Sequence, residues 1–309
     1  MSTAAPLSQP LPFRVLLDEA VRQTRRHLKP IYPAVAFPLA LTAAAMPLAQ
    51  GFLFRNVGGP GAPAPSPRLA LVGYAGFGAV MVVWLVVYYL GYGALLVGAV
   101  DALAQRPISM GRAWRLMLRP RVLGTLLLCA FAAGLGMMLC VVPGIYLGLL
   151  FSLTMPVMVE EGLFGVAAMR RSAELTRYNP QRDLDADPRF KVFVIVLVGT
   201  LLGWVVGMLV QLPMIVVQEV MLLREVAGGR QPDPGRMMAK LAWIQVPSQM
   251  LTMLTQTAIH LYICFGLGLL FFDVKGRKEG LDLEAAVARL VESRFGAPAE
   301  SVGGSPATE

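Results

Sequence analysis

The chain has 309 residues, of which 56% are hydrophobic and only 15% charged, and its mean hydropathy is +0.62. This composition excludes an ordinary soluble protein, in which about a quarter of the residues are charged. The formal net charge of +8 would suit nucleic acid, but the basic residues flank apolar segments, where anionic lipid is the expected partner. We predict an all-α, polytopic helical membrane bundle with no nucleic-acid partner.

Residues 1–29 form the first predicted region, a cytoplasmic tail with an amphipathic helix over Phe13–Lys29. No apolar stretch with a cleavage site occurs there, so we expect the tail to be retained. Apolar residues together with Thr24 recur at helical spacing on one face: Phe13, Leu16, Leu17, Ala20, Val21, Thr24 and Leu28. The opposite face carries charged residues: Arg14, Asp18, Arg22, Arg25 and Arg26. This pattern predicts a helix lying along the membrane surface.

Residues 30–273 contain six apolar segments, and we expect about six transmembrane helices. Their predicted bounds are Ile31–Phe54, Leu69–Val100, Val122–Val142, Ile145–Val159, Val192–Leu212 and Ser248–Phe272. Prolines set two of these bounds: Pro213 is expected to end the fifth span and Pro247 to precede the sixth.

The fourth segment, with only fifteen residues, is short for a bilayer about 30 Å thick. It either thins the bilayer, extends past Glu160 and Glu161, or forms a re-entrant hairpin with the third segment.

The distribution of basic residues predicts the orientation. Of the 27 Lys and Arg residues, 21 fall on the side of the termini and six on the other side. Because cytoplasmic loops are enriched in Lys and Arg, both termini are expected in the cytoplasm. Arg-rich composition with abundant Ala and Gly suggests a bacterial protein, and hence the inner membrane.

Two further basic amphipathic segments are predicted as interfacial helices, near residues 108–121 and 163–177. Together with the first, they give a repeated unit of one amphipathic helix followed by two spans. Internal duplication and selection by the membrane surface explain this equally well. Residues 274–309 are predicted to form a cytoplasmic helix, N-capped by Asp282 and running from Leu283 to about Arg294, and then a disordered tail.

Gly199, Gly203 and Gly207 lie four residues apart in the fifth span and so share one helix face. Small residues at this spacing let helices approach closely, so we interpret them as packing residues. A glycine-lined pore is the alternative.

A polar stripe, defined as Gln249, Thr252, Gln256 and His260, follows one face of the sixth span. Polar side chains in a membrane are costly when they face lipid, so the stripe should face the bundle. It either bonds neighbouring helices, which we favour, or lines a path for a solute or a proton.

Charged residues near the predicted cytoplasmic surface form the third candidate site. Arg170, Arg171 and Glu174 follow the fourth segment, and Arg277 and Lys278 follow the sixth. Surface ion pairs are the plainer interpretation, and contact with lipid headgroups or another cytoplasmic partner is the sharper one.

Catalytic, cofactor and metal motifs are not found, so we expect no enzyme activity, cofactor or metal. Cys129, Cys140 and Cys264 fall in apolar segments and are expected to act as small hydrophobic residues. The alternating Asp183, Asp185 and Asp187 lack the Gly and Glu of a calcium loop, so they predict a solvated acidic loop.

Three stretches resemble the membrane domain associated with glycerophosphoryl diester phosphodiesterases and its stand-alone bacterial inner-membrane relatives. They are Leu17–Leu28; Pro143–Leu147 with Glu161-Gly162 and Arg170–Ser172; and Asp273 with Arg277–Glu284. In two-domain members of that family, this region anchors a catalytic TIM-type barrel. About 35 residues follow the sixth segment, against the roughly 250 of such a barrel, so the resemblance implies membrane anchoring without phosphodiesterase activity.

We therefore expect a non-catalytic scaffold or lipid-associated envelope protein. Anionic lipid on the cytoplasmic face is its expected partner, alongside a protein or a second copy of the chain. A transporter or channel that uses the polar stripe is the alternative.

Overall fold

A computed structural model describes residues 12–57, 66–177, 187–227 and 234–295. Within these residues the regular structure is entirely α-helical, as predicted. The helices are α1 (Phe13–Ile31), α2 (Pro33–Val57), α3 (Pro67–Leu103), α4 (Met110–Met117), α5 (Pro120–Leu139), α6 (Val141–Phe151), α7 (Thr154–Glu160), α8 (Val166–Thr176), α9 (Pro188–Ala227) and α10 (Pro234–Phe295). Asp183, Asp185 and the predicted C-terminal tail lie outside the described residues.

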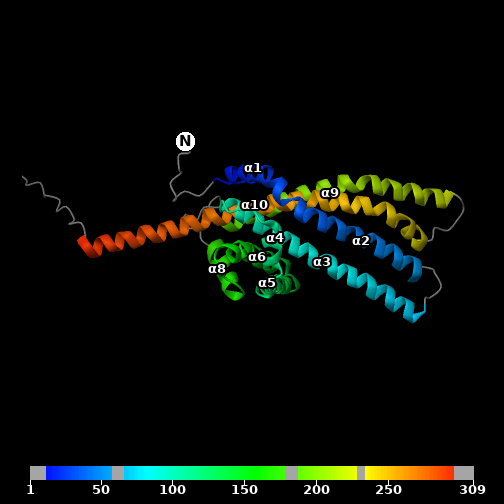
Figure 1. The fold of residues 1–309 in the computed structure, drawn as a ribbon, viewed down its shortest axis with the longest axis horizontal. Helices are drawn as coiled ribbons and strands as arrows, with labels where there is room; N and C mark the ends of the chain where they lie inside the picture. The colour runs from blue at the N-terminus through cyan, green and yellow to red at the C-terminus, as the bar shows by residue number, and fades with distance from the viewer. Residues whose placement is uncertain (1–11, 58–65, 178–186, 228–233, 296–309) are drawn as a thin grey trace, which may run out of the picture.

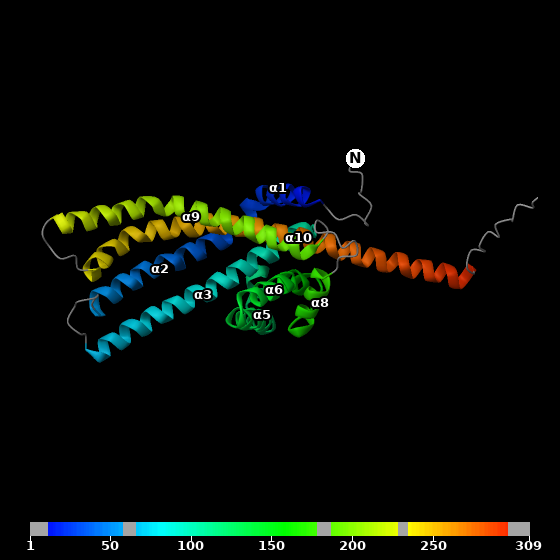
Figure 2. The same ribbon diagram turned by 180° about the vertical axis from the view of Figure 1, so that it is seen from behind.

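Four long helices, α2, α3, α9 and α10, run side by side and form a bundle (Figures 1 and 2). The central helix is α10, which packs against α2, α3 and α9 and is crossed by α1. Short helices α1, α4 and α8 lie at one end of this bundle (Figure 1). We call this the basic end, and the opposite end, where α3 begins at Pro67, the distal end.

Apolar composition explains why these segments are helices in a membrane, where every backbone polar group must find a partner within the protein. In the described residues, six helical stretches are long and apolar enough to cross a bilayer: Pro33–Leu53, Pro67–Leu103, Pro120–Leu139, Val141–Glu160, Pro188–Met221 and Leu241–Gly280. The chain is a multi-pass membrane protein. At 37 residues, or about 55 Å, α3 exceeds the hydrocarbon thickness of about 30 Å, which implies tilt or projection beyond it.

Two predicted helix ends are wrong. Helix α9 continues through Pro213, and α10 begins at Pro234 and continues through Pro247. A proline removes one helical hydrogen bond, but packed neighbours let a membrane helix continue past it.

The predicted separate C-terminal helix is also wrong. Asp282 caps no new helix, because α10 runs unbroken from the bundle to Phe295. Its 62 residues span about 93 Å, and its final part projects beyond the basic end (Figure 1, orange to red).

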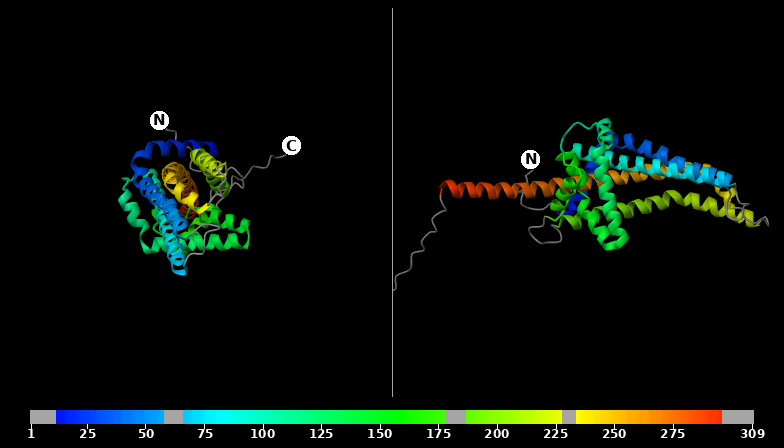
Figure 3. Two further views of the ribbon diagram at one scale, coloured as in Figure 1. Left: turned by 90° about the vertical axis from the view of Figure 1, so that its right-hand side faces the viewer. Right: turned by 90° about the horizontal axis from the view of Figure 1, so that it is seen from below.

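Helices α5 and α6 form a hairpin that lies across the long axis of the bundle (Figure 3). The chain turns at Cys140, whose backbone is extended, and Pro143 lies within the first turn of α6, where proline is tolerated. Gly136 and Gly144 bring the two helices together: a Cβ on Gly136 would lie 3.0 Å from the Gly144 Cα. Broad apolar exposure on this hairpin, including Met138 at 86% and Leu139 at 84%, suits contact with lipid tails.

The three predicted amphipathic segments are helices α1, α4 and α8. Each buries its apolar face, as Leu16 and Ala20 show in α1 and Met117 in α4. A left-handed backbone at Gly165, with φ of +63°, starts α8, a conformation that favours glycine.

His27 of α1 stacks on Phe265 of α10, with ring centroids 5.9 Å apart and planes at 27°. Burial lowers the pKa of His27, and the neighbouring Arg26 charge lowers it further. The folded protein therefore favours the neutral imidazole.

We expect acidification to weaken the contact between α1 and α10. In the unfolded chain His27 takes up its proton near its ordinary pKa of about 6.5, and in the folded chain only at lower pH. The contribution of His27 to the free energy of unfolding is fully present above about pH 6.5. It is lost as the pH falls toward the lowered pKa of His27 in the folded protein. Thermal unfolding in detergent between pH 8 and pH 5 measures it, and His27→Gln should lose less stability over this range. An equal loss in both proteins would contradict this assignment.

Candidate functional site

A charged cluster joins α8 and α10 at the basic end. It comprises Glu161, Arg170, Arg171, Glu174, Lys275, Lys278 and Glu279. The Arg171 Nε atom donates to Glu161 Oε2 at 3.0 Å, and Arg171 Nη2 donates to Glu279 Oε1 at 3.2 Å. The Lys275 Nζ atom lies 3.5 Å from Glu161 Oε1. Arg171 thus connects a carboxylate before α8 with one on α10.

The Arg171 guanidinium is held in its charged form. Its hydrogen bonds to Glu161 raise its pKa, with smaller contributions from the charges of Glu161, Glu279 and Glu174, against the opposing effect of partial burial. Lys278 lies 3.9 Å from the Glu174 carboxylate. These two predicted headgroup contacts are therefore engaged within the protein.

Arg170 differs, because its side chain is 81% exposed and its carboxylate partner is Glu174, at 3.0 Å on the same helix. Exposed pairs of this kind contribute little and break readily. Arg170 also borders an open hollow of about 470 Å³, whose lining includes Leu163, Val166 and Ala167. Among the predicted contact residues in the charged cluster, Arg170 is the most accessible to a headgroup.

Arg277 does not fit the predicted headgroup role, since its side chain is only 4% exposed. Its Nη2 donates to Asp273 Oδ2 at 2.9 Å, and the buried Lys191 Nζ of α9 lies 4.0 Å from the same oxygen. These three residues form a buried charged group, which we call the Asp273 group. It joins α9 to α10 where the membrane-spanning part of α10 ends.

Further basic side chains are exposed at the basic end on α1 and around α4. They are Arg14, Arg25 and Arg26 on α1, and Arg115, Arg119 and Arg121 at α4 and the start of α5. No carboxylate among the described residues lies within 4.0 Å of these six. These six arginines are accessible to a lipid headgroup, whereas most residues of the charged cluster are engaged in ion pairs.

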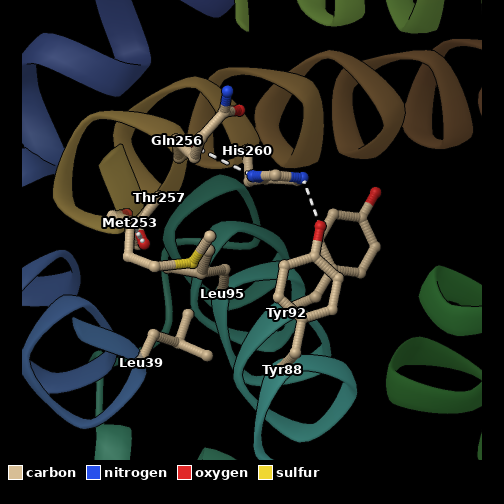
Figure 4. A pocket seen from close by; sticks show the side chains of 8 residues that line it. All are labelled: Leu39, Tyr88, Tyr92, Leu95, Met253, Gln256, Thr257 and His260. Atoms are coloured by element: carbon tan, nitrogen blue, oxygen red, sulfur yellow. Dashed lines mark hydrogen bonds between the residues drawn. The ribbon is translucent and has the colours of Figure 1, made fainter. Parts of the chain in front are cut away.

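The polar stripe of α10 faces the bundle. His260 Nδ1 lies 2.7 Å from the Gln256 carbonyl oxygen, and His260 Nε2 lies 2.9 Å from the Tyr88 hydroxyl of α3 (Figure 4). Because a carbonyl oxygen only accepts, Nδ1 carries a proton, and with Nε2 unprotonated the Tyr88 hydroxyl donates to Nε2. This arrangement holds the His260 imidazole between α10 and α3.

Gln256 connects α10 to α9, since its Nε2 donates to the Gly203 carbonyl at 2.7 Å. A Cβ on Gly203 would lie 2.8 Å from Gln256 Oε1, and one on Gly199 would lie 2.5 Å from Ile263 Cγ1. A Cβ on Gly207 would lie 3.4 Å from Nε2 of the same Gln256 amide. The three glycines thus face α10 at close approach. Thr252 bonds within its own helix, to the Ser248 carbonyl.

Two cavities lie along the stripe. The inner one, about 10 Å³, is close to the size of one water and lies beside Tyr88, Gln256 and His260 (Figure 4). The outer one, about 220 Å³, is lined by residues that include Gln249 and shares Met253 with the first. Toward the basic end α10 continues with the fully buried Cys264 and Phe265. The geometry favours interhelical bonding by Gln256 and His260.

Sequence reasoning missed the aromatic residues of α3 that face this stripe. Trp84 stacks on Tyr88 with centroids 5.5 Å apart, and Tyr88 and Tyr92 both contact His260 edge-on. Their spacing of four residues places them on one helix face, a signal that the sequence contains. The ion pair between Asp101 of α3 and Arg112 of α4 was also missed.

Comparison with protein-family models, with curated proteins and with solved structures finds no match. The kinship with the membrane domain of glycerophosphodiesterases stays a prediction from the motifs.

Proposed function

We propose that this chain is a multi-pass protein of the bacterial inner membrane, with both termini cytoplasmic, that serves as a scaffold binding anionic lipid at its basic end. One observation carries the proposal: six exposed basic residues without nearby described carboxylates lie on α1 and around α4. Exposed arginine side chains without a nearby carboxylate can bind the phosphate of a lipid headgroup.

The surrounding structure supports a lipid partner over a soluble one. Helix α1 lies against α10 by its apolar face and exposes Arg25 and Arg26 beside exposed apolar side chains such as Val21. An amphipathic helix of this kind lies in the headgroup region. Each basic residue there gains about 1 kcal/mol from an anionic leaflet, so several of them favour anionic lipid strongly.

The charged cluster supports the scaffold part of the proposal. Its ion pairs hold α8 on α10, and α10 projects from the basic end as a long helix (Figure 1). A rigid rod fixed to the membrane domain is suited to holding a partner near the cytoplasmic surface. Transport through the polar stripe, the second function that the sequence allows, has less support because Gln256 and His260 bond neighbouring helices.

The test replaces Arg14, Arg25 and Arg26 by Gln in the full chain. Binding of fluorescent phosphatidylglycerol to the protein in phosphatidylcholine nanodiscs should weaken at least tenfold, because about 1 kcal/mol is lost per residue, and added salt should weaken it in the unaltered chain.

Arg224→Gln, an exposed change on α9 near the distal end, is the matched control and should leave affinity unchanged. Equal affinities in the triple variant and the unaltered chain would overturn the proposal, as would binding of phosphatidylcholine as tight as that of phosphatidylglycerol.

A further inference from the structure

The outer cavity lies between α2, α3 and α10, within the membrane-spanning part of the bundle. Its polar lining consists of Gln50 of α2, Trp84 of α3, and Gln245 and Gln249 of α10. Its apolar lining includes Met46 and Met253. At about 220 Å³ it is slightly smaller than the pockets that hold drug-sized ligands, which begin near 300 Å³.

The polar groups of this cavity lack partners in the described part of the protein. The Trp84 Nε1 atom is buried and has no hydrogen-bond acceptor there. The amides of Gln50, Gln245 and Gln249 likewise make no hydrogen bond with described residues. This contrasts with Gln256, about two turns further along α10 than Gln249, whose amide donates to Gly203.

Helix α2 adds a further acceptor. Pro47 has no N–H group, so the carbonyl of Ala43, four residues earlier, loses its usual helical donor. Both residues line the cavity. The residues that line the cavity therefore include amides, which donate and accept, and an indole, which donates, at a depth where lipid offers no hydrogen bonds.

The polar groups that line the outer cavity indicate which class of ligand it could bind. An apolar occupant would leave the buried Trp84 N–H unpaired, at a cost of about 1–3 kcal/mol, and would offer no hydrogen bond to the three carboxamides. An ion would lack a counter-charge, because none of the lining residues is charged, and an unpaired ion is expensive in this setting. An uncharged molecule with several hydroxyls satisfies donors and acceptors together.

We infer that the outer cavity, formed by Gln50, Trp84, Gln245 and Gln249, binds an uncharged polyhydroxylated group, a sugar or a polyol. The group is either a free solute or the headgroup of a lipid. The site is separate from the basic end and does not depend on lipid binding there.

The experiment follows tryptophan fluorescence of the full chain in phosphatidylcholine nanodiscs. One arm adds glucose or myo-inositol, and the other incorporates monoglucosyl diacylglycerol in the bilayer. A saturable change is expected in at least one arm, and its loss in Trp84→Phe would assign it to this cavity. A response to the free compounds identifies a solute site, and a response to the glycolipid alone identifies a headgroup site.

Variants test the carboxamides. Gln245→Leu with Gln249→Leu should raise the half-saturating concentration at least about tenfold, through the lost hydrogen bonds. Gln50→Leu, an exposed change on a different helix, should act in the same direction without disturbing the packing of α10. Gln211→Leu on α9 is the matched control and should leave the response unchanged.

Two results would overturn the inference. One is the absence of a saturable change in both arms for the unaltered chain, which would leave a merely hydrated cavity. The other is unaltered affinity in both the double variant and Gln50→Leu.

Discussion

Replacing Asp273 by Asn is expected to lower the free energy of unfolding by about 3–5 kcal/mol. The Asp273 carboxylate lies 2.9 Å from Arg277 Nη2 and 4.0 Å from Lys191 Nζ. The side chains of Lys191, Asp273 and Arg277 are no more than 6% exposed. The variant keeps the shape of the side chain but removes the negative charge beside Arg277 and Lys191, and removing one partner of a buried ion pair is strongly destabilising.

Thermal unfolding of the purified protein in detergent, followed by loss of the monodisperse species, measures the effect. Glu174→Gln is the matched control, because it removes a carboxylate from exposed ion pairs, which contribute about 0–1 kcal/mol. Combining Asp273→Asn with Arg277→Met removes one of the cations and should restore part of the stability. A loss in Asp273→Asn no greater than that in Glu174→Gln would show that Asp273 does not stabilise the buried cations.

The helical membrane fold could be predicted from the sequence, because long apolar segments and amphipathic periodicity are local properties. The ends of helices were harder. Pro213 and Pro247 resemble helix breakers, but they lie inside α9 and α10, since tertiary packing supports a helix past a proline. The unbroken run of α10 through Asp282 escaped prediction for a similar reason: a local capping pattern does not decide whether a helix starts there.

For the candidate sites, too, local features could be predicted from the sequence, whereas contacts between helices could not. The polar stripe could be placed on one face of a helix from spacing alone, but its partners Tyr88 and Gly203 lie on other helices. Arg277 follows an apolar segment and so resembles a surface cation, yet it is buried beside Asp273. Sequence separation hides such contacts, because they depend on how α9 and α10 pack.

The hairpin of α5 and α6 decides between two topologies that the positive-inside rule does not distinguish. Six crossings place both termini on one side, and so do four crossings with a hairpin held in one leaflet. Because the hairpin lies across the bundle axis (Figure 3) and exposes apolar side chains such as Leu127 and Leu139, we expect it to stay within the hydrocarbon of the leaflet at the basic end.

Cys140, exposed at the turn between α5 and α6, reports this topology once Cys129 and Cys264 are replaced by Ala. In the leaflet topology a membrane-impermeant maleimide should label Cys140 near background in both right-side-out and inverted vesicles, because lipid excludes the reagent. Detergent should restore labelling.

On the same background without Cys140, Ser66→Cys at the distal end and Gly111→Cys on α4 mark the two sides of the membrane. Labelling of Cys140 from the Ser66→Cys side, to the extent of that control, would instead mean that α5 and α6 cross the bilayer. In that case the crosswise hairpin would have to rotate in the membrane, and the apolar surface around Met138 would face lipid along a full span.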